Sequence, residues 1–186
     1  MFYHASQTPH ITVLTPHISN HGKPLIYLST RRENVLVYLS NAVEKCCKEI
    51  GFEHHGSFQK WASYGFTKEG VLRLEEYYPN ATVDTYKGVS GFLYSANVID
   101  HYEKQPDIPY AVITEAPVAV SSCEFIPDAY EAILEAVAEG KIVLCRYEDN
   151  SAAKLDWIKS TNASEYENAE DHPEYRAFLK AKFDFP

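Results

Sequence analysis

Residues 25–29, with the sequence LIYLS, form the apolar run that decides how this chain is expected to fold. Four of these five side chains are apolar or aromatic, which is typical of a strand buried in a sheet. Ser29 and Thr30 are natural N-cap residues, so we expect the strand to lead directly into a helix. A second apolar strand is predicted at residues 2–5, within the segment FYHAS.

Two helices are predicted from helical spacing and end signals. From Glu33, apolar residues recur on one helical face as far as Ile50, and Gly51 is expected to end that helix. Residues 127–128, Pro-Asp, open a second predicted helix, which Gly140 closes.

The remaining segments are rich in strand signals. Residues 91–95, 118–126 and 142–147 are expected to be strands, and a hairpin is predicted with arms at 58–61 and 71–77. Strands and helices do not alternate regularly, and neither a GxGxxG motif nor a P-loop is present. We therefore expect an α+β fold rather than a doubly wound parallel sheet.

Length and composition narrow the class of protein. The 186 residues suit one domain over 1–150, followed by a helical, partly mobile appendage over 151–186. A net charge of −9 disfavours a nucleic-acid partner, because binding to phosphates depends on Lys and Arg. The four cysteines lack CxxC spacing, and the chain has neither a leader sequence nor a long apolar run, so we expect a cytoplasmic protein without membrane insertion.

One histidine and two tyrosines suggest a site for a flat cationic ring. His4 lies on the first predicted strand, Tyr27 lies on the second, and Tyr38 follows eleven residues later. This pattern resembles the ADP-ribosyltransferase superfamily, in its branch with a His-Tyr-Glu triad that includes diphtheria toxin and the poly(ADP-ribose) polymerases. The resemblance implies a bacterial single-domain member with split antiparallel sheets and flanking helices.

In this resemblance each residue has a role in binding NAD, which is the substrate, and no metal is implied. Tyr27 and Tyr38 would sandwich the nicotinamide ring, and each stacked ring would add about 0.5 to 2 kcal/mol of cation–π attraction. His4 and Ser6 would contact ribose. Ala5 stands where the family usually has a glycine whose backbone binds the carboxamide.

Glu124 is the predicted catalytic acid. Cleavage of the bond between ribose and nicotinamide passes through a state like an oxocarbenium ion, which a nearby carboxylate stabilises. Glu124 precedes Phe125 and the proline of residues 127–128, as in many bacterial members of the family. Glu75 and Glu76 are alternative acids, of which only one could point inward from a strand.

The predicted function is transfer of ADP-ribose from NAD to an unknown acceptor, with release of nicotinamide. A protein or small-molecule acceptor is favoured over nucleic acid, and RNA 2′-phosphotransferase activity is disfavoured by the acidic charge. Val35 stands where the polymerase pattern has a serine that binds the carboxamide. A catalytically inactive nucleotide-binding or protein-interaction module of the same fold, or an NAD hydrolase, is therefore the alternative.

Overall fold

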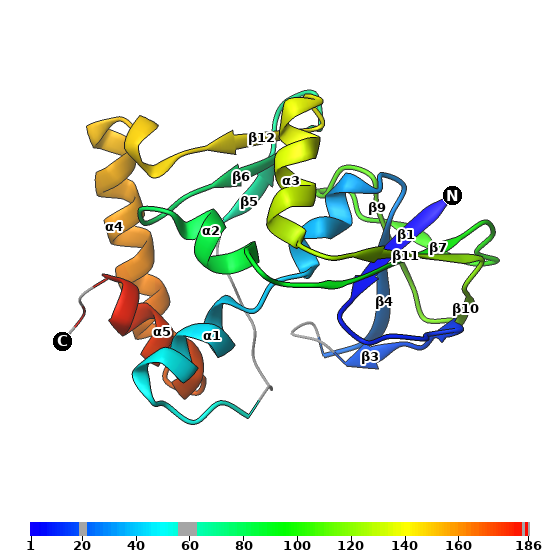
Figure 1. Cartoon of the computed structure of the whole chain (residues 1–186), viewed down its shortest axis with the longest axis horizontal. Helices are drawn as coiled ribbons and strands as arrows, with labels where there is room; N and C mark the ends of the chain where they lie inside the picture. The colour runs from blue at the N-terminus through cyan, green and yellow to red at the C-terminus, as the bar shows by residue number, and fades with distance from the viewer. Residues whose placement is uncertain (19–21, 56–62, 184, 186) are drawn as a thin grey trace. The chain divides into compact units, whose positions relative to one another are not determined.

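The computed structural model describes residues 1–18, 22–55, 63–183 and 185. Within these residues it contains five α-helices and mostly antiparallel sheets, so the predicted α+β class is confirmed (Figure 1). The chain divides into two compact units, each built from segments that are far apart in the sequence. The first unit contains residues 1–40, 65–73 and 87–143, and the second contains 41–64, 74–86 and 144–186. This division differs from the predicted arrangement of a domain over 1–150 and an appendage after it.

A seven-stranded sheet forms the first unit. Its strands follow the order β11-β7-β1-β4-β9-β8, and β3 also pairs with β4. Their bounds are β1 Phe2–Ser6, β3 His17–Ile18, β4 Pro24–Ser29, β7 Gly91–Ala96, β8 Glu103–Lys104, β9 Ala111–Thr114 and β11 Ser122–Ile126. The two short strands β2 (Val13–Leu14) and β10 (Val118–Ala119) pair with each other.

The two faces of this sheet have different coverings. One face contributes Leu28, Tyr94 and Val112 to an apolar core that also contains residues of β2 and β10. The other face is packed by the 3₁₀ helix η1 (Glu33–Tyr38), which also contacts α3 (Ala129–Ala138). We call these the core face and the η1 face.

Gly91 shows how closely the η1 face is packed. A Cβ atom at this position would lie 2.5 Å from Cδ2 of Leu39 and 3.1 Å from the carbonyl oxygen of Ser6. Leu39 is fully buried, so the approach requires a residue without a side chain.

The prediction of one continuous helix from Glu33 to Ile50 was wrong. The structure has η1, a break at Leu39 with φ −85° and ψ 66°, and then α1 (Ala42–Ile50). All four residues from 34 to 37 are buried, so the middle of η1 is enclosed, whereas α1 belongs to the second unit. Gly51 ends α1 with φ 69°, as predicted.

The helix predicted to begin at residues 127–128 was confirmed. The Asp128 carboxylate accepts a hydrogen bond from the Tyr130 amide at 2.9 Å and caps the N-terminus of α3. Gly140 follows the end of this helix with φ 71°.

Helices make up most of the second unit. They are α1, α2 (Ala81–Tyr86), η2 (Tyr147–Asp149), α4 (Ala152–Glu167) and α5 (Pro173–Phe183). α5 packs against α1 and α4, and Cys47, Tyr175 and Phe178 lie in their shared core.

A three-stranded sheet, β12-β6-β5, has strands that pass from one unit to the other along the chain. Its strands are β5 (Tyr64–Phe66), β6 (Leu72–Glu75) and β12 (Ile142–Cys145). β6 coincides with the second arm of the predicted hairpin, and β5 lies where its turn was expected. The predicted first arm, residues 58–61, lies outside the described residues.

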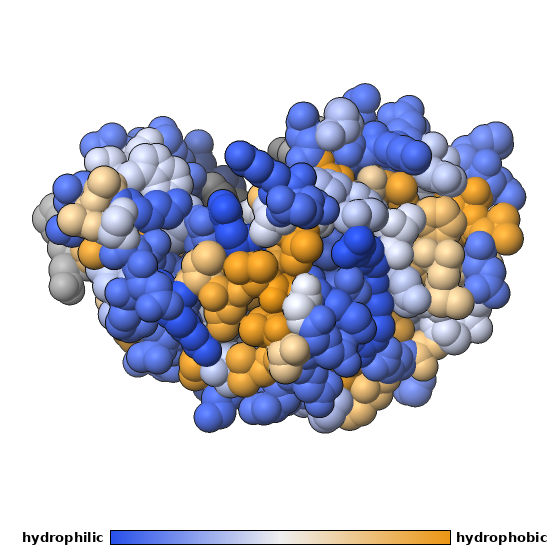
Figure 2. All heavy atoms as spheres, turned by 90° about the horizontal axis from the view of Figure 1, so that it is seen from above, coloured by the Kyte–Doolittle hydropathy of each residue, from blue (hydrophilic) through white to orange (hydrophobic). Residues whose placement is uncertain are grey.

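Hydrophilic residues cover most of the face shown in Figure 2, with apolar residues gathered in limited areas. All four cysteines are free thiols, and Cys46 and Cys47 are buried. Among the described residues, no helix has the length and apolar character needed to cross a membrane.

Candidate functional site

The strand register determines which predicted site residues share a face of the sheet. Side chains directly opposite one another on paired strands lie on the same face. Glu124 pairs with Leu93, and Leu93 pairs with Ala5. Tyr27 pairs with Ile113 on β9, on the face opposite that of Leu28 and Val112. Ala5, Tyr27 and Glu124 therefore belong to the η1 face.

His4 and Ser6 alternate with Ala5 along β1, so they belong to the core face. His4 pairs with Tyr94 and Ser6 pairs with Phe92, and both partners pack in or against the apolar core. The Ser6 hydroxyl accepts a hydrogen bond from the Thr8 amide at 3.1 Å. The sheet thus separates the two predicted ribose contacts from the predicted ring clamp and acid.

The pairing between β1 and β4 is interrupted beside these residues. All five residues of β1 pair with β7, whereas the described pairing of β1 with β4 consists of Tyr3 opposite Ser29. Just beyond this pair, Nδ1 of His4 donates a hydrogen bond to the carbonyl oxygen of Tyr27 at 2.9 Å. The imidazole thereby joins the two strands where the backbone ladder stops, and it brings His4, Ala5 and Tyr27 to one interruption in the sheet.

His4 is held in its neutral form. Burial lowers its pKa below 6.5, and this effect outweighs the opposing effect of the hydrogen bond with Tyr27. Because Nδ1 donates to a carbonyl, Nε2 of the neutral ring is an acceptor, which suits contact with a hydroxyl group.

Tyr27 is half-buried, and Tyr38 is exposed at the end of η1. Val35 is buried in the same 3₁₀ helix, and its neighbour Asn34 has only 7% of its surface exposed. Among the described residues, neither polar atom of the Asn34 side chain has a hydrogen-bond partner. An unsatisfied buried amide is costly, and this one could not be predicted because burial of Asn34 follows from the 3₁₀ geometry of η1.

Glu124 forms an ion pair with Arg32. Nε of Arg32 donates to Oε2 at 2.8 Å, and the second guanidinium contact, from Nη2 to Oε1, completes a bidentate pair. The hydrogen bonds from Arg32 lower the pKa of Glu124, so this carboxylate is ionised at neutral pH. Both side chains remain accessible to solvent, which leaves them open to a ligand.

A row of hydroxyl groups crosses the η1 face beside this pair. Ser122, Ser95, Tyr3 and Ser29 stand directly opposite one another on four neighbouring strands. Ser95 and Ser122 share a hydrogen bond of 2.6 Å, and the Ser29 hydroxyl accepts from the Arg31 amide at 3.1 Å. None of these serines was a predicted site residue, because their alignment depends on a register that no single segment encodes. Ser29 was expected only as a helix N-cap, whereas Arg32 occupies that position of η1 without a side-chain cap.

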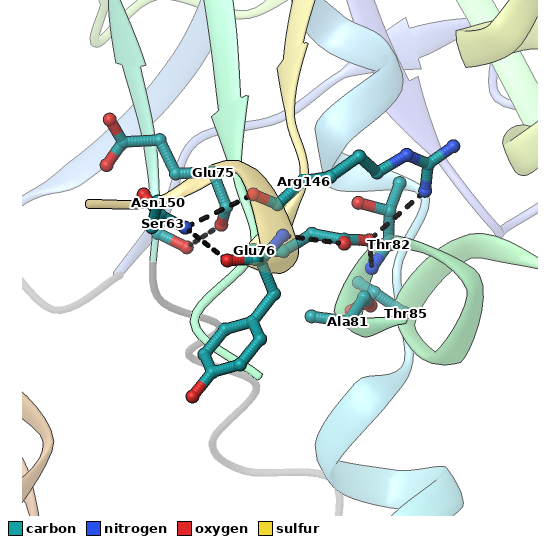
Figure 3. A network of polar contacts seen from close by, with 9 residues as sticks. Ser63, Glu75, Glu76, Ala81, Thr82, Thr85, Arg146 and Asn150 are labelled. Atoms are coloured by element: carbon teal, nitrogen blue, oxygen red, sulfur yellow. Dashed lines mark hydrogen bonds and ion pairs between the residues drawn. The ribbon is translucent and has the colours of Figure 1, made fainter. Parts of the chain in front are cut away.

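The alternative acids lie in the second unit and serve other contacts. Glu75 pairs with Lys154 at 3.2 Å. Glu76 is the inward-pointing member, with 1% of its surface exposed, and it pairs with Arg146 at 3.3 Å (Figure 3). It also accepts the backbone amide of Thr82 at 3.0 Å, so its carboxylate is surrounded by donors from the protein.

We found no protein-family model, curated protein or solved structure that matches the chain.

Proposed function

We propose that the first unit binds NAD and transfers its ADP-ribose group to an acceptor, releasing nicotinamide. The observation that carries this proposal is the interrupted pairing of β1 and β4, where His4 bridges to the Tyr27 carbonyl. His4 and Tyr27, two of the residues that the family resemblance implies, meet there although they lie 23 positions apart in the sequence. The proposal extends to the fold, which we take to be the split antiparallel sheet of the ADP-ribosyltransferases.

The reaction would use the ionised Glu124 carboxylate. The bond between the ribose anomeric carbon and the pyridinium nitrogen breaks, and its electron pair leaves with nicotinamide. Glu124 stabilises the positive charge that develops on ribose, and the acceptor then bonds to the same carbon and releases a proton. Arg32 keeps the carboxylate ionised and offers its guanidinium to the pyrophosphate of NAD.

Nicotinamide recognition would depend on residues around η1. Tyr27 stacks on the ring and Tyr38 closes over it, while the Ala5 backbone binds the carboxamide. Asn34 supplies the contact with the carboxamide that Val35 cannot make. Within the described structure, both polar atoms of the Asn34 side chain have no hydrogen-bond partner. Nε2 of His4 and the Ser6 hydroxyl contact ribose from the other side of the interruption.

Binding without turnover, by an inactive relative, is the second candidate function. Glu124 and Tyr27 lie on β11 and β4, the outer two of four neighbouring strands, and three strand spacings of about 4.8 Å amount to about 14 Å. Both carboxylate oxygens of Glu124 already accept hydrogen bonds from Arg32. Transfer therefore requires that the ligand displaces Arg32 and draws Glu124 inward, whereas binding without turnover requires neither step.

Calorimetric titration with NAD, followed by an assay of nicotinamide release, tests the proposal. The transferase predicts binding and release, and it predicts that Glu124→Gln lowers release at least 100-fold while the Kd for NAD changes less than threefold. Glu135→Gln is the matched control, because it removes the same charge from an exposed position on α3. Binding without release would establish the second candidate, and no binding at millimolar NAD would refute both.

The variant Asn34→Leu tests whether the Asn34 amide binds the ligand or stabilises the fold. Replacing an unsatisfied buried amide with an apolar side chain of similar size should leave the folded protein as stable or more stable. If Asn34 binds the carboxamide, the same variant loses NAD affinity about tenfold. Unchanged affinity would remove Asn34 from the site.

A further inference from the structure

A cavity of about 630 Å³ opens on the first unit beside strands β4, β8 and β9. This volume is within the range of small-molecule sites. Leu25 and Ile113 supply apolar surface, and Tyr102 adds an aromatic ring to the lining. Ile113 is directly opposite Tyr27 on the η1 face, so the cavity adjoins the proposed site.

Charged side chains of the cavity are predominantly acidic. Asp100, Glu103 and Glu115 contribute three carboxylates to the lining, against the single ammonium group of Lys23. An anionic ligand would meet net repulsion here, whereas an organic cation would find carboxylates near an apolar surface. The Tyr102 ring would add attraction for a cation that lies over its face.

The three carboxylates and the Lys23 ammonium group are also available to a ligand. Within the described ranges, none of the three carboxylates nor Lys23 forms an ion pair or a side-chain hydrogen bond. By contrast, Glu124 is paired with Arg32. The cavity therefore combines volume, apolar surface and available carboxylates.

We propose that this cavity binds a small organic cation bearing two or more amino groups on an aliphatic body. Its amino groups would pair with the carboxylates, and its methylene groups would cover Leu25 and Ile113. The assignment as a cation site stands by itself. That the bound amine is also the acceptor of ADP-ribose rests on the proposed function, because the cavity adjoins Tyr27 on the same face.

Titration of the whole protein with spermidine, at 150 mM NaCl and without NAD, tests the cavity. We expect one equivalent to bind, and we expect the double variant E103Q/E115Q to bind at least tenfold more weakly. The double variant E131Q/E135Q is the control, since it removes two charges from exposed positions on α3. Equal weakening in both variants would show general attraction to an acidic protein and would overturn the site, as would absence of binding to the wild type.

The variant Lys23→Met should change the affinity for spermidine in the opposite direction. Removing the ammonium group should tighten spermidine binding severalfold, and weaker binding would overturn the cationic class of ligand. Circular dichroism melting confirms that each variant folds. A separate NAD titration distinguishes the two proposals: spermidine binding without NAD binding would refute the proposed function alone, and NAD binding without spermidine binding would refute the cavity alone.

Discussion

Two glutamate–arginine pairs in this protein have the same chemistry and different surroundings. The Glu76 side chain in the second unit is 1% exposed, and Arg146 and backbone amides surround its carboxylate (Figure 3). The Glu124 side chain in the first unit is 52% exposed, and within the described part of the chain its carboxylate is bound by Arg32 alone. The difference teaches that pairing does not reveal a function: the buried pair fixes local structure, whereas the exposed pair can be exchanged for a ligand.

The largest effect is expected from Glu76→Gln. Loss of the charge breaks the ion pair with Arg146 and replaces one acceptor oxygen with an NH2 group, a donor that faces the donor of one of the two backbone amides. Breaking a buried pair typically costs 3 to 5 kcal/mol, and we expect a loss of about 3 kcal/mol here because Arg146 keeps some access to water. Urea unfolding gives the free energy of unfolding, and Glu124→Gln is the matched exposed variant, with an expected loss below about 1 kcal/mol. Similar losses in the two variants would refute the contrast.

Arg146→Met removes the other member of the buried pair. The carboxylate of Glu76 then keeps its backbone donors, the amides of Thr82 and Tyr147 at 3.0 and 3.3 Å. Those donors and entering water offset part of the lost attraction, so we expect a smaller destabilisation of about 1 to 2 kcal/mol. A loss as large as that of Glu76→Gln would show that the amides contribute little, and the same urea experiment measures it.

The sequence predicted the parts of the fold that depend on local signals. The helix start at residues 127–128 and the helix end at Gly51 follow from neighbouring residues, and both were confirmed. The break at Leu39 was missed, because two adjacent helices in different units share one continuous apolar pattern.

The site was less predictable than the fold because it depends on register. Which side of the sheet His4 and Tyr27 occupy is set by pairing with β7 and β9, whose residues lie far along the chain. The Arg32–Glu124 pair joins positions 92 residues apart, and sequence spacing does not predict contacts over such a distance along the chain.

His4 is a partly buried polar group, and it tests whether a neutral partner behaves differently from an ion pair. Its pKa is lowered by burial, so the unfolded chain binds a proton more readily than the folded protein does. The free energy of unfolding should therefore fall as the pH drops through 6.5 toward the lower pKa of the folded state. Melting temperatures between pH 7.5 and 5.5 should show this loss, and His4→Asn should reduce it. The exposed His10→Asn variant controls for removal of a histidine, and an unchanged slope in His4→Asn would contradict the assignment.

The smallest effect is expected from the pH dependence of the exposed pair. Hydrogen bonds from Arg32 lower the pKa of Glu124 below 4.5, so the pair stabilises the folded protein above the pKa of an unfolded glutamate. At pH 7 the wild type should be more stable than Glu124→Gln by only a few tenths of a kcal/mol, since solvent screens an exposed pair. This difference should vanish as the pH falls through the lowered pKa of Glu124, and thermal unfolding from pH 7 to 3 measures it. A difference that persists at pH 3 would mean that Glu124 stabilises the fold through contacts other than its charge, and the exposed pair would then resemble the buried one.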